Sequence, residues 1–172
     1  MQQHIFFDLE DTVITPVTDG WWKTELIYQN TIQKVLQRWP GAKHHLFSFA
    51  LHDGHQLRLF NEGTRPMLEK SLGKVLVETP TMDDDILPVC CKAKGLIPSL
   101  TSFSDVVEFW GKDLTFRMWI RHWLSNNPST ERRQILFLDD AVQDEDIFLR
   151  EYQAEVFIRN IDSLVQDFDK HW

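Results

Sequence analysis

Short apolar runs alternate with segments of helical pattern along almost the whole chain. Ile, Leu, Val and Phe dominate the runs at 5–7, 46–51, 74–78, 134–138 and 154–158, and short runs of this kind, bounded by polar residues, are typical of buried strands. Because strands alternate with helices, we expect a parallel sheet covered on both faces. The predicted fold class is α/β, a Rossmann-like three-layer sandwich with a central, mainly parallel β-sheet.

The spacing of apolar residues predicts helices over 25–39, 56–72, 104–110 and 163–168, and another that starts after Asp113 as its N-cap. Gly63 and Pro66 predict a kink or break in the second of these. The segment 79–102 contains three prolines, and we expect an irregular stretch that is either a solvated loop or a cover for the sheet edge or a substrate. We expect residues 1–172 to form a single domain.

A turn signal follows the first apolar run. Asp19-Gly20 is preceded by alternating Val, Ile and Thr residues, which predicts a small hairpin over 12–22. Trp21 and Trp22 come directly after this turn. Contact with a substrate and capping of the core both remain open for these two side chains.

Composition argues against several classes of protein. The chain has 172 residues and a net charge of −8, so attraction to nucleic acid or an anionic membrane is not favoured, although a bound cation or a local basic patch would change this. No apolar run approaches the roughly 20 residues that span a bilayer, and no signal peptide pattern is present. The adjacent Cys90 and Cys91 are expected to be reduced thiols. We therefore expect a cytoplasmic protein.

Two of the predicted strands end in acids. Asp8 follows Ile5-Phe6-Phe7, and Asp139-Asp140 follow the run at 135–138. In open α/β sheets, ligands bind outside the carboxyl ends of the strands. Three carboxylates gathered at this edge would suit Mg²⁺, which takes few protein carboxylates and keeps water or phosphate as its other ligands.

These residues resemble two motifs of the haloacid dehalogenase-like (HAD) phosphatase superfamily. Asp8-Leu9-Glu10-Asp11-Thr12 is similar to the first motif, an apolar strand followed by Asp-x-Asp-x-Thr. The acidic pair Asp139-Asp140 with Asp144 is similar to the fourth. Glu10 departs from the family, which has Asp at that position. The resemblance covers nearly the whole chain and implies a HAD-like fold with a small hairpin flap over the site.

The resemblance also implies a function, a Mg²⁺-dependent phosphohydrolase whose nucleophile Asp8 forms an aspartyl-phosphate. Glu10 would act as general acid and base, and its backbone carbonyl would bind the metal. The resemblance assigns the metal to Asp8, Glu10, Asp139 and Asp140, leaving open which of the pair ligates it, with Asp144 orienting the metal or its waters.

Three further residues are matched to substrate binding by the resemblance. Thr12 closes the first motif. Ser48 fits the second motif, a hydroxyl that binds a phosphate oxygen, but if the strand runs on through Leu51, His52 would occupy its end instead. Lys112 fits the third motif and would stabilise both Asp8 and the phosphate, with Arg117 and Arg121 as its substitutes.

Alternatives remain open for the function and for access to the site. Glu10 is consistent with an active phosphatase, but also with a catalytically weak HAD-fold protein that binds a phosphorylated ligand or a partner protein. The chain has no long insertion, so a capless or minimally capped form is expected, either open to large phosphorylated substrates or closed by a neighbouring subunit of a homo-oligomer. His44-His45 lack cysteine partners at zinc-site spacing, and packing or exposure explains them better.

Overall fold

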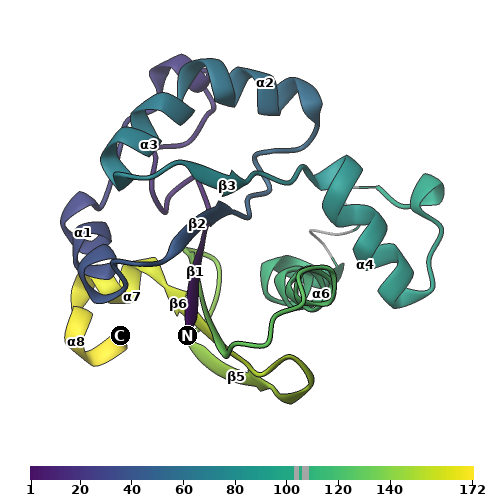
Figure 1. Ribbon diagram of the computed structural model, residues 1–172. Coiled ribbons are helices and arrows are strands. Elements are labelled where there is room, and N and C mark those ends of the chain that lie inside the picture. Colours follow the sequence, from purple (N-terminus) through teal and green to yellow (C-terminus); the bar gives the residue numbers. More distant parts are fainter. Residues whose placement is uncertain (103–104, 106–108) are drawn as a thin grey trace.

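A six-stranded sheet forms the centre of the computed structural model, which describes residues 1–102, 105 and 109–172 (Figure 1). The strands are β1 (Gln2–Phe7), β2 (Lys43–Leu46), β3 (Leu76–Glu78), β4 (Arg133–Asp139), β5 (Glu145–Leu149) and β6 (Ala154–Asn160). Their order is β3-β2-β1-β4-β6-β5, and every neighbouring pair is parallel except β5 with β6. The predicted α/β class with a mainly parallel central sheet is confirmed.

Helices cover both faces of the sheet. They are α1 (Gln29–Arg38), α2 (Gly54–Gly63), α3 (Arg65–Leu72), α4 (Leu87–Lys94), α6 (Gly111–Asn126), α7 (Ile161–Gln166) and α8 (Phe168–His171). Figure 1 shows α6 on one side of the sheet and α1, α7 and α8 on the other. No helix among the described residues is long and apolar enough to cross a membrane.

The two faces of β1 supply two separate cores. Successive side chains of a strand point to opposite faces of the sheet. Ile5 and Phe7 pack in the core beneath α1, α2, α3 and α7, whereas Phe6 packs in the core beneath α4 and α6. Since β1 lies between β2 and β4, its carboxyl end is enclosed on both sides by neighbouring strands.

The second strand lies earlier in the chain than the sequence predicted. The predicted strand over 46–51 is wrong, because β2 ends at Leu46 and a turn follows. The β2 residues His44 and His45 have polar side chains, yet both are buried, one on each face of the strand. The Phe47 amide still donates to the Phe7 carbonyl at 2.9 Å, so the chain leaves the sheet directly before Ser48.

The flap predicted after the first strand is present, but its pairing is wider than predicted. Thr15 N–H donates to the Glu25 carbonyl at 2.9 Å, and Ile27 N–H donates to the Val13 carbonyl at 3.0 Å. Between these arms lies a short 3₁₀ helix, η1 (Trp21–Lys23). The helix predicted over 25–39 therefore begins only at Gln29.

The predicted break in the second helix is confirmed, since α2 ends at Gly63 and α3 starts at Arg65. The prediction that 79–102 is irregular is wrong for part of its length. It contains a π turn, η2 (Met82–Ile86), the helix α4 and a 3₁₀ turn, η3 (Pro98–Leu100). Pro88 lies in the first turn of α4, where a backbone N–H has no acceptor within the helix, so the missing N–H of proline costs no hydrogen bond.

Three other elements differ from the sequence prediction. The helix α6 begins at Gly111, so Asp113 lies in its first turn and is not its N-cap. The edge strand β5 was not predicted, and a 3₁₀ turn, η5 (Arg150–Tyr152), links it to β6. Most of the helix predicted over 104–110 lies outside the described residues. The predicted terminal helix appears as α7 and α8.

Candidate active site

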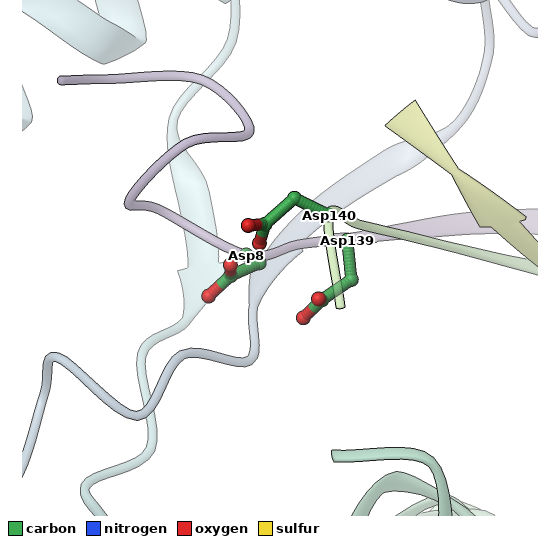
Figure 2. Close-up of side chains that lie close together, drawn as sticks. All are labelled: Asp8, Asp139 and Asp140. Atoms are coloured by element: carbon green, nitrogen blue, oxygen red, sulfur yellow. The ribbon is translucent and has the colours of Figure 1, made fainter. Parts of the chain in front are cut away.

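Three carboxylates meet at the carboxyl ends of β1 and β4. Asp8 directly follows β1, Asp139 ends β4, and Asp140 comes next, so the parallel register of β1 and β4 brings them to one edge. One oxygen from each of the three carboxylates lies within 4.8 Å of the others, and Figure 2 shows the three side chains side by side. Asp8 and Asp139 are buried, and Asp140 is half-buried.

Lys112, in the first turn of α6, joins two of these carboxylates. Its Nζ lies 3.0 Å from Asp8 Oδ1 and 3.0 Å from Asp139 Oδ2, and its side chain is only 9% exposed. Burial opposes the charged ammonium, but Asp8 and Asp139 outweigh it and keep the pKa of Lys112 above its usual value. The ring of Phe49 lies 4.3 Å from Nζ, which adds a cation–π contact. Lys112 is thus a fixed positive charge beside Asp8.

The arrangement contains more negative charge than Lys112 can neutralise. Burial and the neighbouring Asp8 raise the pKa of Asp139 above its ordinary value, and the same two causes raise the pKa of Asp140 to about 6. Asp139 Oδ2 is buried, and the Lys112 ammonium beside it is shared with Asp8. A hard cation bound by Asp8, Asp139 and Asp140 would relieve both conditions, so these oxygen donors fit Mg²⁺.

The two hydroxyl residues predicted to bind substrate are Thr12, which lies next to this cluster, and Ser48, which lies at the same edge of the sheet. Thr12 is buried and its hydroxyl donates to Asp8 Oδ2 at 3.4 Å, a long hydrogen bond. Ser48 follows the end of β2, the strand next to β1, and its Oγ accepts a hydrogen bond from the Ala50 amide at 3.2 Å. The alternative that placed His52 at the end of this strand is wrong, because β2 ends at Leu46.

The Glu10 side chain is engaged in the flap. Its Oε2 accepts a hydrogen bond from the Val17 amide at 2.9 Å. Glu10 is not part of the carboxylate group that could hold a cation. The extra methylene that distinguishes Glu from Asp therefore serves to reach the backbone of the flap in this conformation.

Asp144 lies one step away from the cluster. Its Oδ1 accepts a hydrogen bond from the Asn160 amide at 2.8 Å, and its Oδ2 lies 3.1 Å from His171 Nδ1. The Asn160 side chain in turn donates to the carbonyls of Asp140 and Val142, at 3.1 and 2.9 Å. Asp144 and Asn160 together fix the loop that carries Asp140, and the predicted orienting of a metal by Asp144 stays a prediction.

Sequence reasoning missed Phe49 and Asn160. Phe49 gives no local signal, because its role depends on Lys112, far along the chain. Asn160 did give one, since it stands between an apolar run and a helical pattern, where its side chain caps α7 through a 3.0 Å hydrogen bond from the Ser163 amide. Arg117 and Arg121, the proposed substitutes for Lys112, instead pair with Glu145 and Glu151.

Comparison with models of protein families, with curated proteins and with solved structures found no match to the chain. The likeness to the HAD superfamily therefore rests on the motifs described above and on nothing else. Membership of that superfamily stays a prediction.

Proposed function

We propose that the protein is a phosphohydrolase that cleaves phosphate monoesters through a covalent intermediate on Asp8, as in the HAD superfamily. The observation that carries this proposal is the position of Lys112, a buried cation 3.0 Å from both Asp8 and Asp139, with Asp140 beside them. A carboxylate can attack phosphorus only if the repulsion between two anions is offset. A fixed ammonium beside the nucleophile provides part of that offset.

The residues divide the reaction into two displacements. Asp8 attacks phosphorus, the ester P–O bond breaks, and the departing oxygen takes a proton. Water then attacks the phosphorus of the aspartyl-phosphate, and the bond to the Asp8 oxygen breaks to release inorganic phosphate. Mg²⁺, held by Asp8, Asp139, Asp140 and the carbonyl of Glu10, would neutralise charge on the phosphoryl oxygens. Lys112 holds Asp8 in place, and the hydroxyls of Thr12 and Ser48 are assigned to phosphate binding.

Glu10 is assigned the proton transfers, and in this structure its carboxylate accepts a hydrogen bond from the Val17 amide. Its carboxylate has to leave the Val17 amide, or work from there through a water, to reach a departing oxygen. The same hydrogen bond favours a second candidate function, a protein that binds a phosphorylated ligand or a partner and turns over slowly. In that case Glu10 serves only to hold the flap.

The setting proposed for this reaction is the cytoplasm. Cys90 and Cys91 are both free and buried, which agrees with reduced thiols. The substrate is proposed to be a phosphorylated molecule. Without a cap over the site, large substrates can be admitted as well as small ones.

Phosphate release from an aryl phosphate tests the proposal. We expect turnover that requires Mg²⁺ and disappears in Asp8→Asn, which keeps the shape of the side chain and removes the attacking charge. Asp11→Asn is the matched control, because this exposed aspartate lies in the same loop but outside the cluster. Absence of turnover in the unmodified protein would favour the binding protein, and unchanged turnover in Asp8→Asn would refute the nucleophile.

A further inference from the structure

The loop between β4 and β5 carries Asp140 and is held from outside the carboxylate site. Asn160, the last residue of β6, donates from its side chain to the main-chain carbonyls of Asp140 and Val142, at 3.1 and 2.9 Å. Asp144 Oδ1 accepts a hydrogen bond from the Asn160 amide at 2.8 Å. The position of Asp140 in the cluster therefore depends on the contact between Asp144 and Asn160.

The other oxygen of Asp144 is bound by His171, at the end of α8. His171 Nδ1 lies 3.1 Å from Asp144 Oδ2. A carboxylate oxygen accepts hydrogen bonds, so Nδ1 is the donor. The side chains of His171 and Asp144 are 28% and 33% exposed. Because a partly exposed pair contributes little to global stability, its loss should leave the fold intact.

Helix α8 is fixed in place by contacts that do not involve His171. Phe168 is buried, and its ring stacks on the Trp172 ring with the two centroids 5.3 Å apart. The Trp172 ring also lies edge-on to Trp39, at 6.0 Å between centroids. Arg159 donates from Nε and Nη2 to the main-chain oxygen of Trp172, at 3.3 and 3.2 Å. Replacement of His171 should therefore remove the contact with the loop and leave α8 docked.

We propose that His171 is a positioning residue for the cation site, and that it acts through Asp144 and Asn160 on the loop that carries Asp140. The proposal rests on the cation site of the proposed function and not on turnover. Asp144 is not part of the group that could hold the cation, and both of its oxygens already accept hydrogen bonds. It therefore affects the cation through the loop and not as a ligand. Loss of such a supporting contact typically weakens metal binding by about 10- to 100-fold.

Cation binding to the full chain tests this proposal without any turnover. Mn²⁺ serves as the probe, because it takes the same oxygen ligands as Mg²⁺ and the EPR signal of the free ion gives Kd. His171→Leu should raise Kd about tenfold. His171→Asn places an amide N–H where histidine carries the Nδ1 proton, so it should restore most of the affinity. The matched control is His122→Leu, which removes an exposed imidazole that is bonded to Asn126 near the far end of α6 and should leave Kd unchanged.

The direction of the change separates positioning from charge. Any positive charge on the His171 imidazole repels a bound cation, so removal of that charge alone would lower Kd. A rise in Kd in His171→Leu therefore reports the lost hydrogen bond to Asp144.

Amide hydrogen exchange in the metal-free chain measures the position of the loop directly. The amides of Asn160 and Ala141 donate to Asp144 Oδ1 and Asp139 Oδ1, at 2.8 and 2.7 Å. Both amides should exchange faster in His171→Leu, because the loop is less constrained. The amides within β1 should keep their rates, which distinguishes a local change from a general loss of stability.

An unchanged Kd in His171→Leu would overturn this proposal and leave the cation site of the proposed function intact. The same holds if both amides exchange at their original rates, or if His171→Asn loses as much affinity as His171→Leu, since the imidazole donor would then be irrelevant. If the unmodified chain binds no Mn²⁺, the cation site itself is refuted, and the role of His171 is refuted with it.

Discussion

The two ends of β1 bury polar side chains in different ways. At the carboxyl end, Asp8 and Asp139 lie next to the Lys112 ammonium, 3.0 Å from each. At the amino end, His4 and His45 are buried as a neutral pair that shares one hydrogen bond. A buried charge requires a counter-charge, whereas a neutral ring requires only hydrogen-bond partners. The carboxyl end thus gathers charged groups around one shared cation, whereas the amino end buries neutral rings.

Removal of Lys112 should have the largest effect. Lys112→Gln leaves two buried carboxylates without their cation, so we expect the free energy of unfolding to fall by about 3 kcal/mol. Turnover should fall by about a hundredfold or more, as when one fixed donor is lost from an active site. Urea unfolding and hydrolysis of an aryl phosphate measure the two effects.

The control for this change is Arg121→Gln on the same helix. The ion pair of Arg121 with Glu151 is exposed on both sides, so its loss should change stability little. If Lys112→Gln and Arg121→Gln lower the free energy of unfolding equally, the buried ion pairs of Lys112 contribute no more to stability than an exposed pair. The comparison between the ends of β1 then fails.

Glu10→Gln separates proton transfer from support of the flap. The amide oxygen of Gln can still accept the Val17 hydrogen bond, but the side chain can no longer transfer a proton. We expect a loss of about a hundredfold on alkyl phosphates and a smaller loss on aryl phosphates, whose leaving groups need little protonation. Equal losses on both substrates would assign Glu10 to positioning. Glu10→Asp, which is too short to reach Val17 from the same backbone position, reports the flap contact separately.

Mg²⁺ that binds at the carboxyl end of β1 should stabilise the folded protein. At a Mg²⁺ concentration of about 100 times Kd, the free energy of unfolding should rise by about 2.7 kcal/mol. Thermal unfolding with and without Mg²⁺ measures this rise, which the double variant Asp139→Asn with Asp140→Asn should abolish. Asp146→Asn, outside the cluster, is the matched control. A rise that persists in the double variant would place the cation elsewhere.

The last predicted effect concerns pH and the amino end. The folded-state pKa values of His4 and His45, about 4 and about 3, lie below the value near 6.5 of an unfolded chain. Below about pH 6.5 the unfolded chain therefore binds more protons than the native chain, and stability falls as the pH falls toward about 4. Well above pH 6.5 both rings are neutral in the folded and the unfolded state, so they contribute no pH dependence.

Asp139 and Asp140 have the opposite effect on stability. Because their pKa values are raised in the folded state, the native chain binds these protons at a higher pH than the unfolded chain does, and stability rises as the pH falls. The histidine effect is therefore measured by urea unfolding of the Asp139→Asn, Asp140→Asn double variant over this pH range. Adding His45→Gln should make the pH dependence shallower. An unchanged slope would show that the buried pair does not control acid stability.

The sheet and the acidic site could be predicted because their signals are local. Asp8 and Asp139 each end a continuous apolar run, and parallel strands place such ends at one edge. Lys112 was matched by its place in the chain, and the structure brings it to both aspartates. Predictions of this kind succeed where a residue and the strand that carries it are neighbours in the sequence.

The remaining features depend on contacts between distant segments. The prediction missed β2 because His44 and His45 are polar. Their burial follows from packing on both faces of the sheet and not from their own polarity. The hydrogen bond from Val17 to Glu10 follows from the path of the flap, which sequence spacing does not define. A cleft of about 400 Å³ at the amino end of β1 is lined by residues from β1, β2, α6 and β4, and no sequence motif predicts it.

Chemical trapping of the intermediate tests the central claim most directly. The protein is mixed with an aryl phosphate and Mg²⁺, quenched rapidly and reduced with borohydride, which converts an aspartyl-phosphate to homoserine. Peptide mass spectra should then show homoserine at position 8 in the unmodified protein and in the Asp11→Asn control, and none in Asp8→Asn. Phosphate release without homoserine at position 8, or with homoserine at position 139 or 140 instead, would contradict the assignment of Asp8 as the nucleophile.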